Sequence, residues 1–125
     1  VKIYGNYIGT DYTETLTTGN EYCGILLDYD IDFVDIGGSN SRGNVIANNA
    51  EGIRVGDESF GVSILENAFM CNDSVAIRLE GVANNSQKPP VWDTTPETSL
   101  TMVSGTAEAG NAFVEIFLVD NSNCS

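Results

Sequence analysis

The stretch that decides the fold runs from Gly43 to Phe69 and reads GNVIANNAEGIRVGDESFGVSILENAF. Its apolar residues come in very short runs, and Asn, Gly or acidic residues separate each run from the next. A helix would need apolar residues at every third and fourth position over several turns, and no window of the chain shows this pattern. Because Gly and Asn interrupt every such window, the stretch favours short strands joined by tight turns.

Three short motifs recur in a fixed order along the first part of the chain. The first is a small residue followed by an apolar-x-apolar triplet, found at Gly24–Leu27, Gly52–Val55 and Ala76–Leu79. The second is an apolar-x-apolar triplet alone, found at Val1–Ile3, Val34–Ile36 and Val62–Ile64. The third begins with Asn and is found at Asn6–Ile8, Asn44–Ile46 and Asn67–Phe69. Each period of roughly two dozen residues therefore carries three strands and three turns.

Strands this short do not form a stable hairpin sheet on their own. They become stable if each period stacks on the next, so that equivalent strands pair in parallel about 4.8 Å apart and bury one continuous apolar column. We therefore predict an all-β fold, a right-handed parallel β-helix of about three coils followed by a short antiparallel β segment. An insertion such as residues 10–22 can leave one turn of such a stack without disturbing the strand pairing.

The alternation of side chains along each strand predicts which residues face inward. The expected core consists of Ile25, Leu27, Val34, Ile36, Ile46, Ile53, Val55, Val62, Ile64, Phe69, Ile77 and Leu79. Three outward columns are expected between them, formed by Leu26, Arg54 and Arg78, by Lys2, Asp35 and Ser63, and by Tyr7, Val45 and Ala68. Asn6, Asn44 and Asn67 occupy the same turn of each coil, so their amide groups are predicted to form a hydrogen-bonded ladder.

The chain divides into three predicted parts, which are parallel β-helix repeats at 1–83, a linker at 84–98 and a partial β-sandwich module at 99–125. The linker contains Pro89 and Pro90, which cannot donate to a strand ladder. The last part contains two longer alternating stretches, 99–106 and 112–119, which are typical of antiparallel strands.

The composition is that of a folded and strongly acidic protein. Apolar residues make up 42% of the chain, and 18 Asp and Glu residues against 5 Lys and Arg residues give a formal charge of −13. Such a charge repels the phosphates of nucleic acids and of anionic lipids, so we expect no nucleic-acid partner. Neither a signal peptide nor a transmembrane helix is predicted, so no membrane insertion is expected. Because the repeats are under way at the first residue, we expect further domains of a longer parent chain.

The three cysteines have no spacing typical of a metal site, and the chain has no histidine, so zinc binding is not expected. Cys23 and Cys71 are interpreted as small apolar residues at or beside strand ends, and a disulfide between them is left open as an alternative. Cys124 lies in a polar stretch, and we expect it to pair with a cysteine beyond residue 125.

The repeat motifs carry a resemblance to a known family. The segments GNYIGTD, IGG, GNVIANN and GIRV resemble the right-handed parallel β-helix repeats of bacterial surface and secreted proteins in the pectate-lyase-like superfamily. The tail VSGTAEAGNAFVEIFLVDNSNC is similar to the start of the immunoglobulin-like β-sandwich modules that often follow such repeats. The resemblance implies an extracellular or cell-surface bacterial protein of several modules, whose partner is a glycan or a cell-surface polysaccharide.

Enzymes of this superfamily, which are polysaccharide lyases and glycosidases, place clustered aspartates with an Arg, Lys or His on one outward sheet. This sequence has no paired Asp-Asp, no Gly-His-Gly and no Arg-Ile-Lys, and we assign no catalytic residue. We therefore expect a non-catalytic structural and binding segment that presents a rigid rod for glycan or cell-surface adhesion. The alternative is a carbohydrate-active enzyme, either a polysaccharide lyase or a glycoside hydrolase, with further catalytic residues outside this chain.

Arg54 and Arg78 are candidate substrate-binding residues. Stacking would place two guanidinium groups on adjacent coils, and like charges repel unless an anion lies between them. That anion could be the carboxylate of a uronic acid, which Arg binds through two parallel hydrogen bonds. Glu80, Asp28 or Glu51 could neutralise the pair instead.

Tyr7, Asp28, Asp30 and Asp32 complete the set of candidate site residues. Tyr7 is an outward aromatic residue that could stack on the C–H face of a sugar, or could cover the edge of a small core. The three aspartates share one face if residues 28–32 are extended, and their oxygens suit Ca²⁺. Solvated turn residues, and acid and base groups for glycoside hydrolysis, are the other interpretations. No cofactor other than Ca²⁺ is expected.

Overall fold

The structure is a computed structural model that describes residues 1–92, 105–106 and 124. Its strands are β1 (Lys2–Ile3), β2 (Tyr7–Ile8), β3 (Cys23–Leu27), β4 (Asp35–Gly37), β5 (Val45–Ala47), β6 (Glu51–Val55), β7 (Ser63–Leu65), β8 (Ala68–Met70), β9 (Ile77–Leu79), β10 (Val91–Trp92) and β11 (Gly105–Thr106). The element α1 (Ala83–Ser86) is one turn in which Asn84 and Asn85 have positive φ angles. The described residues thus form an all-β fold.

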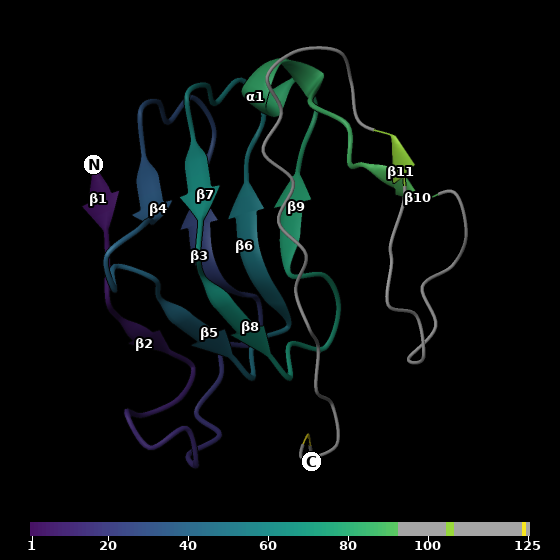
Figure 1. The fold of residues 1–125 in the computed structure, drawn as a ribbon. Helices are drawn as coiled ribbons and strands as arrows, with labels where there is room; N and C mark the ends of the chain where they lie inside the picture. The colour runs from purple at the N-terminus through teal and green to yellow at the C-terminus, as the bar shows by residue number, and fades with distance from the viewer. Residues whose placement is uncertain (93–104, 107–123, 125) are drawn as a thin grey trace.

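The first nine strands form three parallel sheets, each of which takes every third strand of the chain (Figure 1). The sheets are β1-β4-β7, β2-β5-β8 and β3-β6-β9. We call each set of three consecutive strands a rung, so the rungs are β1 to β3, β4 to β6 and β7 to β9. This arrangement follows from the three motifs that recur in fixed order, because each motif supplies one strand to each rung.

The pairing register confirms the stacking predicted from the repeats. Ile25, Ile53 and Ile77 are paired from rung to rung. The three predicted outward columns are also in register, as Leu26, Arg54 and Arg78, as Lys2, Asp35 and Ser63, and as Tyr7, Val45 and Ala68. The side chains therefore alternate between the interior and the outer face as the period of two requires.

The core matches the predicted set of inward residues. Those buried are Ile25, Leu27, Val34, Ile36, Ile46, Ile53, Val55, Val62 and Phe69. Ile64, Ile77 and Leu79 are partly buried and pack against them. All three lie in the last rung, where no further described rung covers them. The interior is one continuous apolar column, which is what makes such short strands stable.

The predicted asparagine ladder is present and is buried in its middle. The side-chain Nδ2 of Asn6 donates to Asn44 Oδ1 at 2.9 Å, and Asn44 Nδ2 donates to Asn67 Oδ1 at 2.9 Å. The backbone N–H groups of Asn6 and Asn44 donate to the same two oxygens at 3.0 Å. The amide of each rung therefore satisfies backbone and side-chain donors of its neighbour, and this fixes the turn between the first two strands of each rung.

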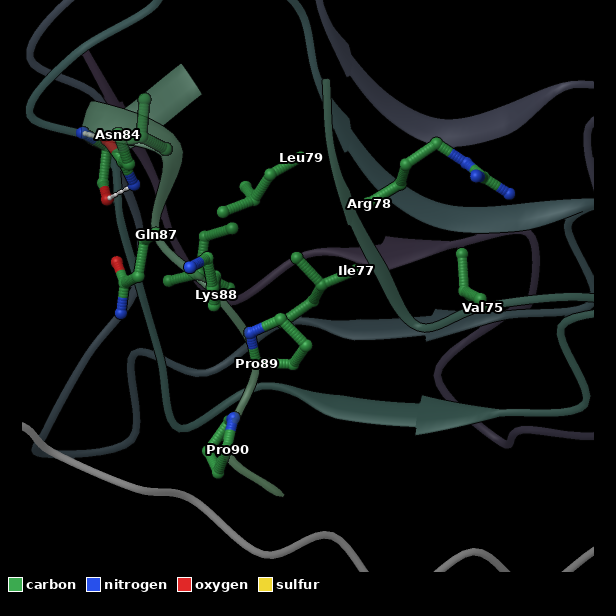
Figure 2. Close-up of a pocket in the computed structure, with 11 residues that line it drawn as sticks. Val75, Ile77, Arg78, Leu79, Asn84, Gln87, Lys88, Pro89 and Pro90 are labelled. Atoms are coloured by element: carbon green, nitrogen blue, oxygen red, sulfur yellow. Dashed lines mark hydrogen bonds between the residues drawn. The ribbon is translucent and has the colours of Figure 1, made fainter. Parts of the chain in front are cut away.

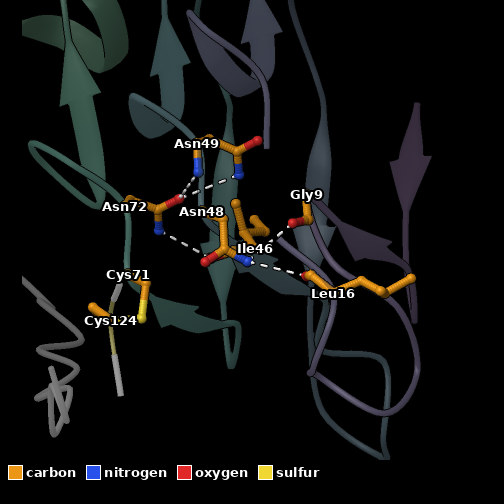
Figure 3. Close-up of a disulfide and its surroundings, with 8 residues drawn as sticks. All are labelled: Gly9, Leu16, Ile46, Asn48, Asn49, Cys71, Asn72 and Cys124. Atoms are coloured by element: carbon orange, nitrogen blue, oxygen red, sulfur yellow. Dashed lines mark hydrogen bonds between the residues drawn. A yellow bond between two sulfur atoms is a disulfide. The ribbon is translucent and has the colours of Figure 1, made fainter. Parts of the chain in front are cut away.

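A second asparagine ladder lies at the turn that leads into the third strand of each rung. Asn20 Nδ2 donates to Asn49 Oδ1 at 2.8 Å, and Asn49 Nδ2 donates to Asn72 Oδ1 at 3.2 Å. Figure 3 shows Asn49 and Asn72 side by side in this ladder. The insertion at residues 10–22 leaves this turn as a strand-free loop, and β3 still pairs in register with β6, as predicted. The insertion also leaves the Asn20–Asn49 contact of this ladder intact.

The cysteines correct our prediction. Cys71 forms a disulfide with Cys124 across a sequence separation of 53 residues, and the two Cα atoms are 5.2 Å apart (Figure 3). Cys71 is therefore not an unpaired apolar residue, and Cys124 does not need a partner beyond residue 125. Cys23 is buried with a free thiol, as the apolar interpretation predicts, and burial raises its pKa. The sequence pattern around each cysteine is local, so it does not reveal this long-range pairing.

The segment after the third rung contains more structure than the predicted linker. The Asn84 side chain exchanges two hydrogen bonds with the backbone of Val62, at 3.0 and 2.8 Å, and thereby fixes α1 to the last rung. Val91–Trp92 forms β10, which pairs antiparallel with β11. β11 is the described part of the strand predicted at 99–106. The strand predicted at 112–119 lies outside the described residues. Apart from β11 and Cys124, the same is true of the predicted sandwich module.

Candidate functional site

The outer face of the β3-β6-β9 sheet carries an ion-pair cluster built around Glu51. Arg54 Nε donates to Glu51 Oε2 at 2.8 Å, and Arg78 Nε donates to Glu51 Oε1 at 2.8 Å. Glu80 contacts the Arg54 guanidinium at 3.2 Å, and the ring of Tyr22 lies 4.5 Å from it. One carboxylate thus bridges two arginines that strand pairing places on adjacent rungs.

The charges of this cluster stabilise one another. Hydrogen bonds from Arg54 and Arg78 lower the pKa of Glu51 from 4.5 to about 2, although burial opposes this shift. The hydrogen bond to Glu51 raises the pKa of Arg54 above its usual value. Of the neutralising partners considered from the sequence, Glu51 and Glu80 contact the arginines. Two positive and two negative side chains therefore form a neutral cluster on the sheet surface.

Tyr7 lies on a different sheet from the two arginines. It belongs to β2, pairs in register with Val45 and is 46% exposed. The structure therefore brings Arg54 and Arg78 together and leaves Tyr7 on the outer face of the β2-β5-β8 sheet. A single ligand would have to cross an edge between two sheets to contact all three residues.

Asp28, Asp30 and Asp32 lie in the turn between β3 and β4, and all three are exposed. Asp30 has a positive φ of 59°, and Asp32 Oδ1 accepts a hydrogen bond from the Phe60 N–H at 2.7 Å. Within the described part of the chain, no group of three or more Asp, Glu, Cys or His side chains is arranged to hold a metal ion. Calcium binding by these aspartates stays a prediction, and a rise in melting temperature on addition of Ca²⁺ would test it.

The same turn carries exposed apolar residues that we did not select from the sequence. We call Tyr29, Ile31 and Phe33, together with the half-buried Phe60 of the next rung, the aromatic corner. Phe33 is 77% exposed, Tyr29 is 57% exposed and Ile31 is 39% exposed. The signal was present in the sequence DYDIDF, where apolar residues alternate with the three aspartates.

A smaller aromatic cluster lies at the first rung. The Tyr4 ring has the Arg42 guanidinium 5.3 Å from its centre and the Lys2 ammonium 6.0 Å away. The Tyr4 hydroxyl donates to Asp35 Oδ2 at 3.3 Å. This cluster joins positive charge to an aromatic ring, which distinguishes it from the acidic surroundings of the aromatic corner.

A pocket of about 480 Å³ lies between the last rung and the segment after α1 (Figure 2). Its lining consists of Val62, Ile64, Val75, Ile77, Arg78, Leu79, Asn84, Gln87, Lys88, Pro89 and Pro90. Among these described residues there is no carboxylate, so the pocket has no acid-base pair of the kind that glycoside hydrolysis uses. Val62, Ile64, Ile77 and Leu79, which form part of its wall, also belong to the apolar core at the last rung.

Comparison with known proteins gives no relative: no family model, no curated protein and no solved structure matches the chain. Among the described residues, no helix has the length and apolar character needed to cross a bilayer.

Proposed function

We propose that the three rungs are coils of a right-handed parallel β-helix of the pectate-lyase-like type, in a bacterial protein with further modules. The in-register pairing of three parallel sheets, two asparagine ladders and a continuous apolar interior support this fold. In such a stack each coil contacts only its neighbours, so added coils lengthen the structure without changing its cross-section.

We propose further that the segment is a non-catalytic rod that presents binding residues to glycans or cell surfaces. The observation that carries this function is the exposed aromatic corner on a backbone fixed from rung to rung. Phe33 N–H donates to the Phe60 carbonyl at 3.0 Å, and Ile31 N–H donates to Ser59 Oγ at 3.0 Å. Aromatic side chains held on a rigid support lose little entropy when a sugar ring stacks on them.

The ion-pair cluster supports a structural rather than a catalytic function for the two arginines. A lyase-type base must give up its proton near neutral pH. The hydrogen bond between Arg54 and Glu51 raises the Arg54 pKa, which is the opposite of what such a base requires. Arg54 and Arg78 therefore serve best as partners of Glu51 on the sheet surface.

The disulfide supports an extracellular or cell-surface location for this rod. The bond between Cys71 and Cys124 joins the last rung to the end of the chain. Disulfides of this structural kind persist in oxidising compartments and are rare in the cytosol. The strongly acidic composition is compatible with a protein that must stay soluble outside the cell.

The test of the proposed function is a glycan-binding screen run alongside a lyase and glycosidase assay. The protein would be applied to arrays of neutral, amino and uronic-acid glycans, and the same glycans would be incubated with it and analysed for cleavage. Binding without cleavage is the expected result. Cleavage would establish the carbohydrate-active enzyme instead, and the absence of both would overturn the glycan-presenting function and leave only a scaffold.

A further inference from the structure

The aromatic corner combines exposure with an unfavourable backbone. Phe33 has φ = 55°, a left-handed conformation that a bulky residue rarely adopts. Burial of the ring in the core would offset this cost, but the residue is 77% exposed. Stability of the isolated rod therefore does not account for a phenylalanine at this position.

The ring of Phe33 is nevertheless held in place. A Cβ atom at Gly61 would lie 2.9 Å from Phe33 Cδ1 and 3.2 Å from Cε1, so the ring rests against a glycine of the next rung. Gly61 has φ = +65°, and the same glycine therefore serves both the turn and the ring. Tyr29 is fixed too, because its hydroxyl donates to Glu58 Oε2. Phe33 and Tyr29 of the corner therefore both contact the turn at residues 56–62.

The surroundings of the aromatic corner are strongly negative. The two turns that form it, residues 28–34 and 56–62, contain five carboxylates and no Lys or Arg, the carboxylates being Asp28, Asp30, Asp32, Asp57 and Glu58. The backbone nitrogen of Val1 also reaches the first turn, where it donates to the Phe33 carbonyl oxygen at 3.0 Å. The excess of negative charge in the two turns repels uronates, sulfates and phosphates and attracts cations.

We propose that the aromatic corner binds glycans that carry free amino groups, such as polymers of glucosamine. The C–H face of a sugar ring stacks on Phe33, and its ammonium groups lie among the carboxylates of Asp30 and its neighbours. A cationic peptide would satisfy the charge, but peptide recognition uses a groove, a sheet edge or a pocket. The aromatic corner is a turn, and none of its residues lines the pocket described above. The inference rests on the proposed function and specifies its ligand class and its binding site.

The first test replaces Phe33 by Asn. Asn tolerates the left-handed backbone, so Phe33→Asn removes the ring without adding strain. Binding of glucosamine oligosaccharides, measured by calorimetry, should weaken about tenfold, while the melting temperature stays unchanged or rises. Tyr12→Ala is the matched control, because Tyr12 is another aromatic residue that is 79% exposed, and it should bind as the wild type does. Unchanged binding by Phe33→Asn, or a loss of stability that accounts for weaker binding, would overturn the inference.

The second test concerns charge. Asp30→Asn keeps the shape and the backbone preference of the residue but removes one carboxylate, and it should weaken the binding of glucosamine oligosaccharides several-fold at low salt. Oligosaccharides of N-acetylglucosamine, which lack the positive charge, should bind the wild-type protein more weakly. Equal binding of the two oligosaccharides would refute the charge requirement. Polylysine provides a further comparison. If it binds as strongly as the amino glycan does, and if Phe33→Asn does not change its binding, the corner is a purely ionic surface and the inference fails.

The outcomes separate this inference from the proposed function. If the wild-type protein binds neutral or acidic glycans, and Phe33→Asn does not affect that binding, the inference fails and the glycan-presenting function stands. The Tyr4 cluster would then be the next site to mutate. If no glycan of any class binds, both proposals fail together.

Discussion

At the scale of single residues, the fold depends on polar side chains that satisfy their neighbours across rungs. Asn44 and Glu51 are both almost fully buried, yet each bonds residues of the rung before or after its own. Buried polar groups are costly when they lose their partners, so such residues specify the register as well as stabilising it. Their removal should therefore destabilise the protein more than removal of an exposed residue of the same type.

Replacing Asn44 by Ala should cost about 2–3 kcal/mol or more of unfolding free energy. The change removes Asn44 Oδ1, which accepts from the Asn6 N–H and Nδ2, and it also removes the donor to the Ile3 carbonyl at 2.8 Å. Urea unfolding followed by circular dichroism would measure the loss. Asn6→Ala, at the exposed end of the same ladder, is the control and should cost about 1 kcal/mol or less. Equal costs at the two positions would contradict a role for the buried amide.

Replacing Glu51 by Gln should lower the melting temperature by several degrees, because the two arginines would repel each other. The pKa of Glu51 is lowered to about 2 by its arginine partners. Its stabilising effect is therefore fully present above the ordinary pKa of 4.5 and is lost as the pH falls through about 2. Melting curves of both proteins across this range should converge at the acidic end. Glu21→Gln, at an exposed position, should show neither effect.

At the scale of elements, the strands are short enough that close approach between neighbouring rungs matters. A Cβ atom at Gly52 would lie 2.3 Å from the Ala76 carbonyl oxygen and 2.9 Å from Phe69 Cδ1. Gly52 is the small residue with which the motif of β6 begins. The backbone that leads into the paired strand β9 lies so close to this position that only a small residue fits there. The motif recognised in the sequence thus has a steric origin.

Gly52→Ala should destabilise the protein by about 1–3 kcal/mol, because the new methyl group overlaps backbone that cannot move without breaking the β6-β9 pairing. Thermal unfolding would measure the change. Gly5→Asn is a suitable control, since nothing lies within 4 Å of its Cβ position and Asn tolerates its φ of +62°. If Gly52→Ala melted like the control, the sheets would be more loosely paired than the structure shows.

The same elements show what could be predicted from the sequence. The core and the outward columns were predictable because a period of two and a fixed motif order determine them once stacking is assumed. The ladder through Asn49 was missed, although Asn20, Asn49 and Asn72 each precede a small-apolar motif, because variable spacing hides their alignment. The pairing of Cys71 with Cys124 was not predictable, because no local pattern records which distant residues meet.

The candidate site was predictable only in part, for an electrostatic reason. The predicted stacking correctly placed Arg54 beside Arg78. The stacking does not reveal that the Glu51 carboxylate, from the same strand as Arg54, contacts both guanidinium groups and bridges them. The aromatic corner was overlooked because the aspartates of the same turn suggested a metal site. Whether an aromatic residue of a turn is exposed or belongs to the core depends on its packing, and packing requires coordinates.

At the scale of the whole molecule, the disulfide connects the last rung to residue 124. It ties Cys124 to Cys71, which directly follows β8 in the last rung. Cross-linking residues this far apart in the sequence restricts the unfolded chain, and the loop-entropy estimate for such a separation is about 4 kcal/mol. The restraint acts on the last rung, in which Ile64, Ile77 and Leu79 are only partly buried.

Reduction of the disulfide should lower the melting temperature of the protein by several degrees or more. Peptide mapping by mass spectrometry before and after reduction would identify the linked pair as Cys71 and Cys124. The double variant Cys71→Ser and Cys124→Ser should melt at the lower temperature and should not respond to reductant. A link to Cys23, or a melting temperature that reductant does not change, would contradict the observed pairing.

The loop between β2 and β3 has a consequence for engineering. From Ile8 to Cys23 the chain makes a long excursion, whereas the equivalent turns from Ala47 to Glu51 and from Met70 to Ile77 are much shorter, and yet β3, β6 and β9 remain paired. We therefore expect this turn to accept foreign sequence of variable length. An epitope or affinity tag grafted between Tyr12 and Leu16 should be displayed at the surface while the rod beneath it folds normally, which would make the protein a carrier for vaccine peptides or sensors.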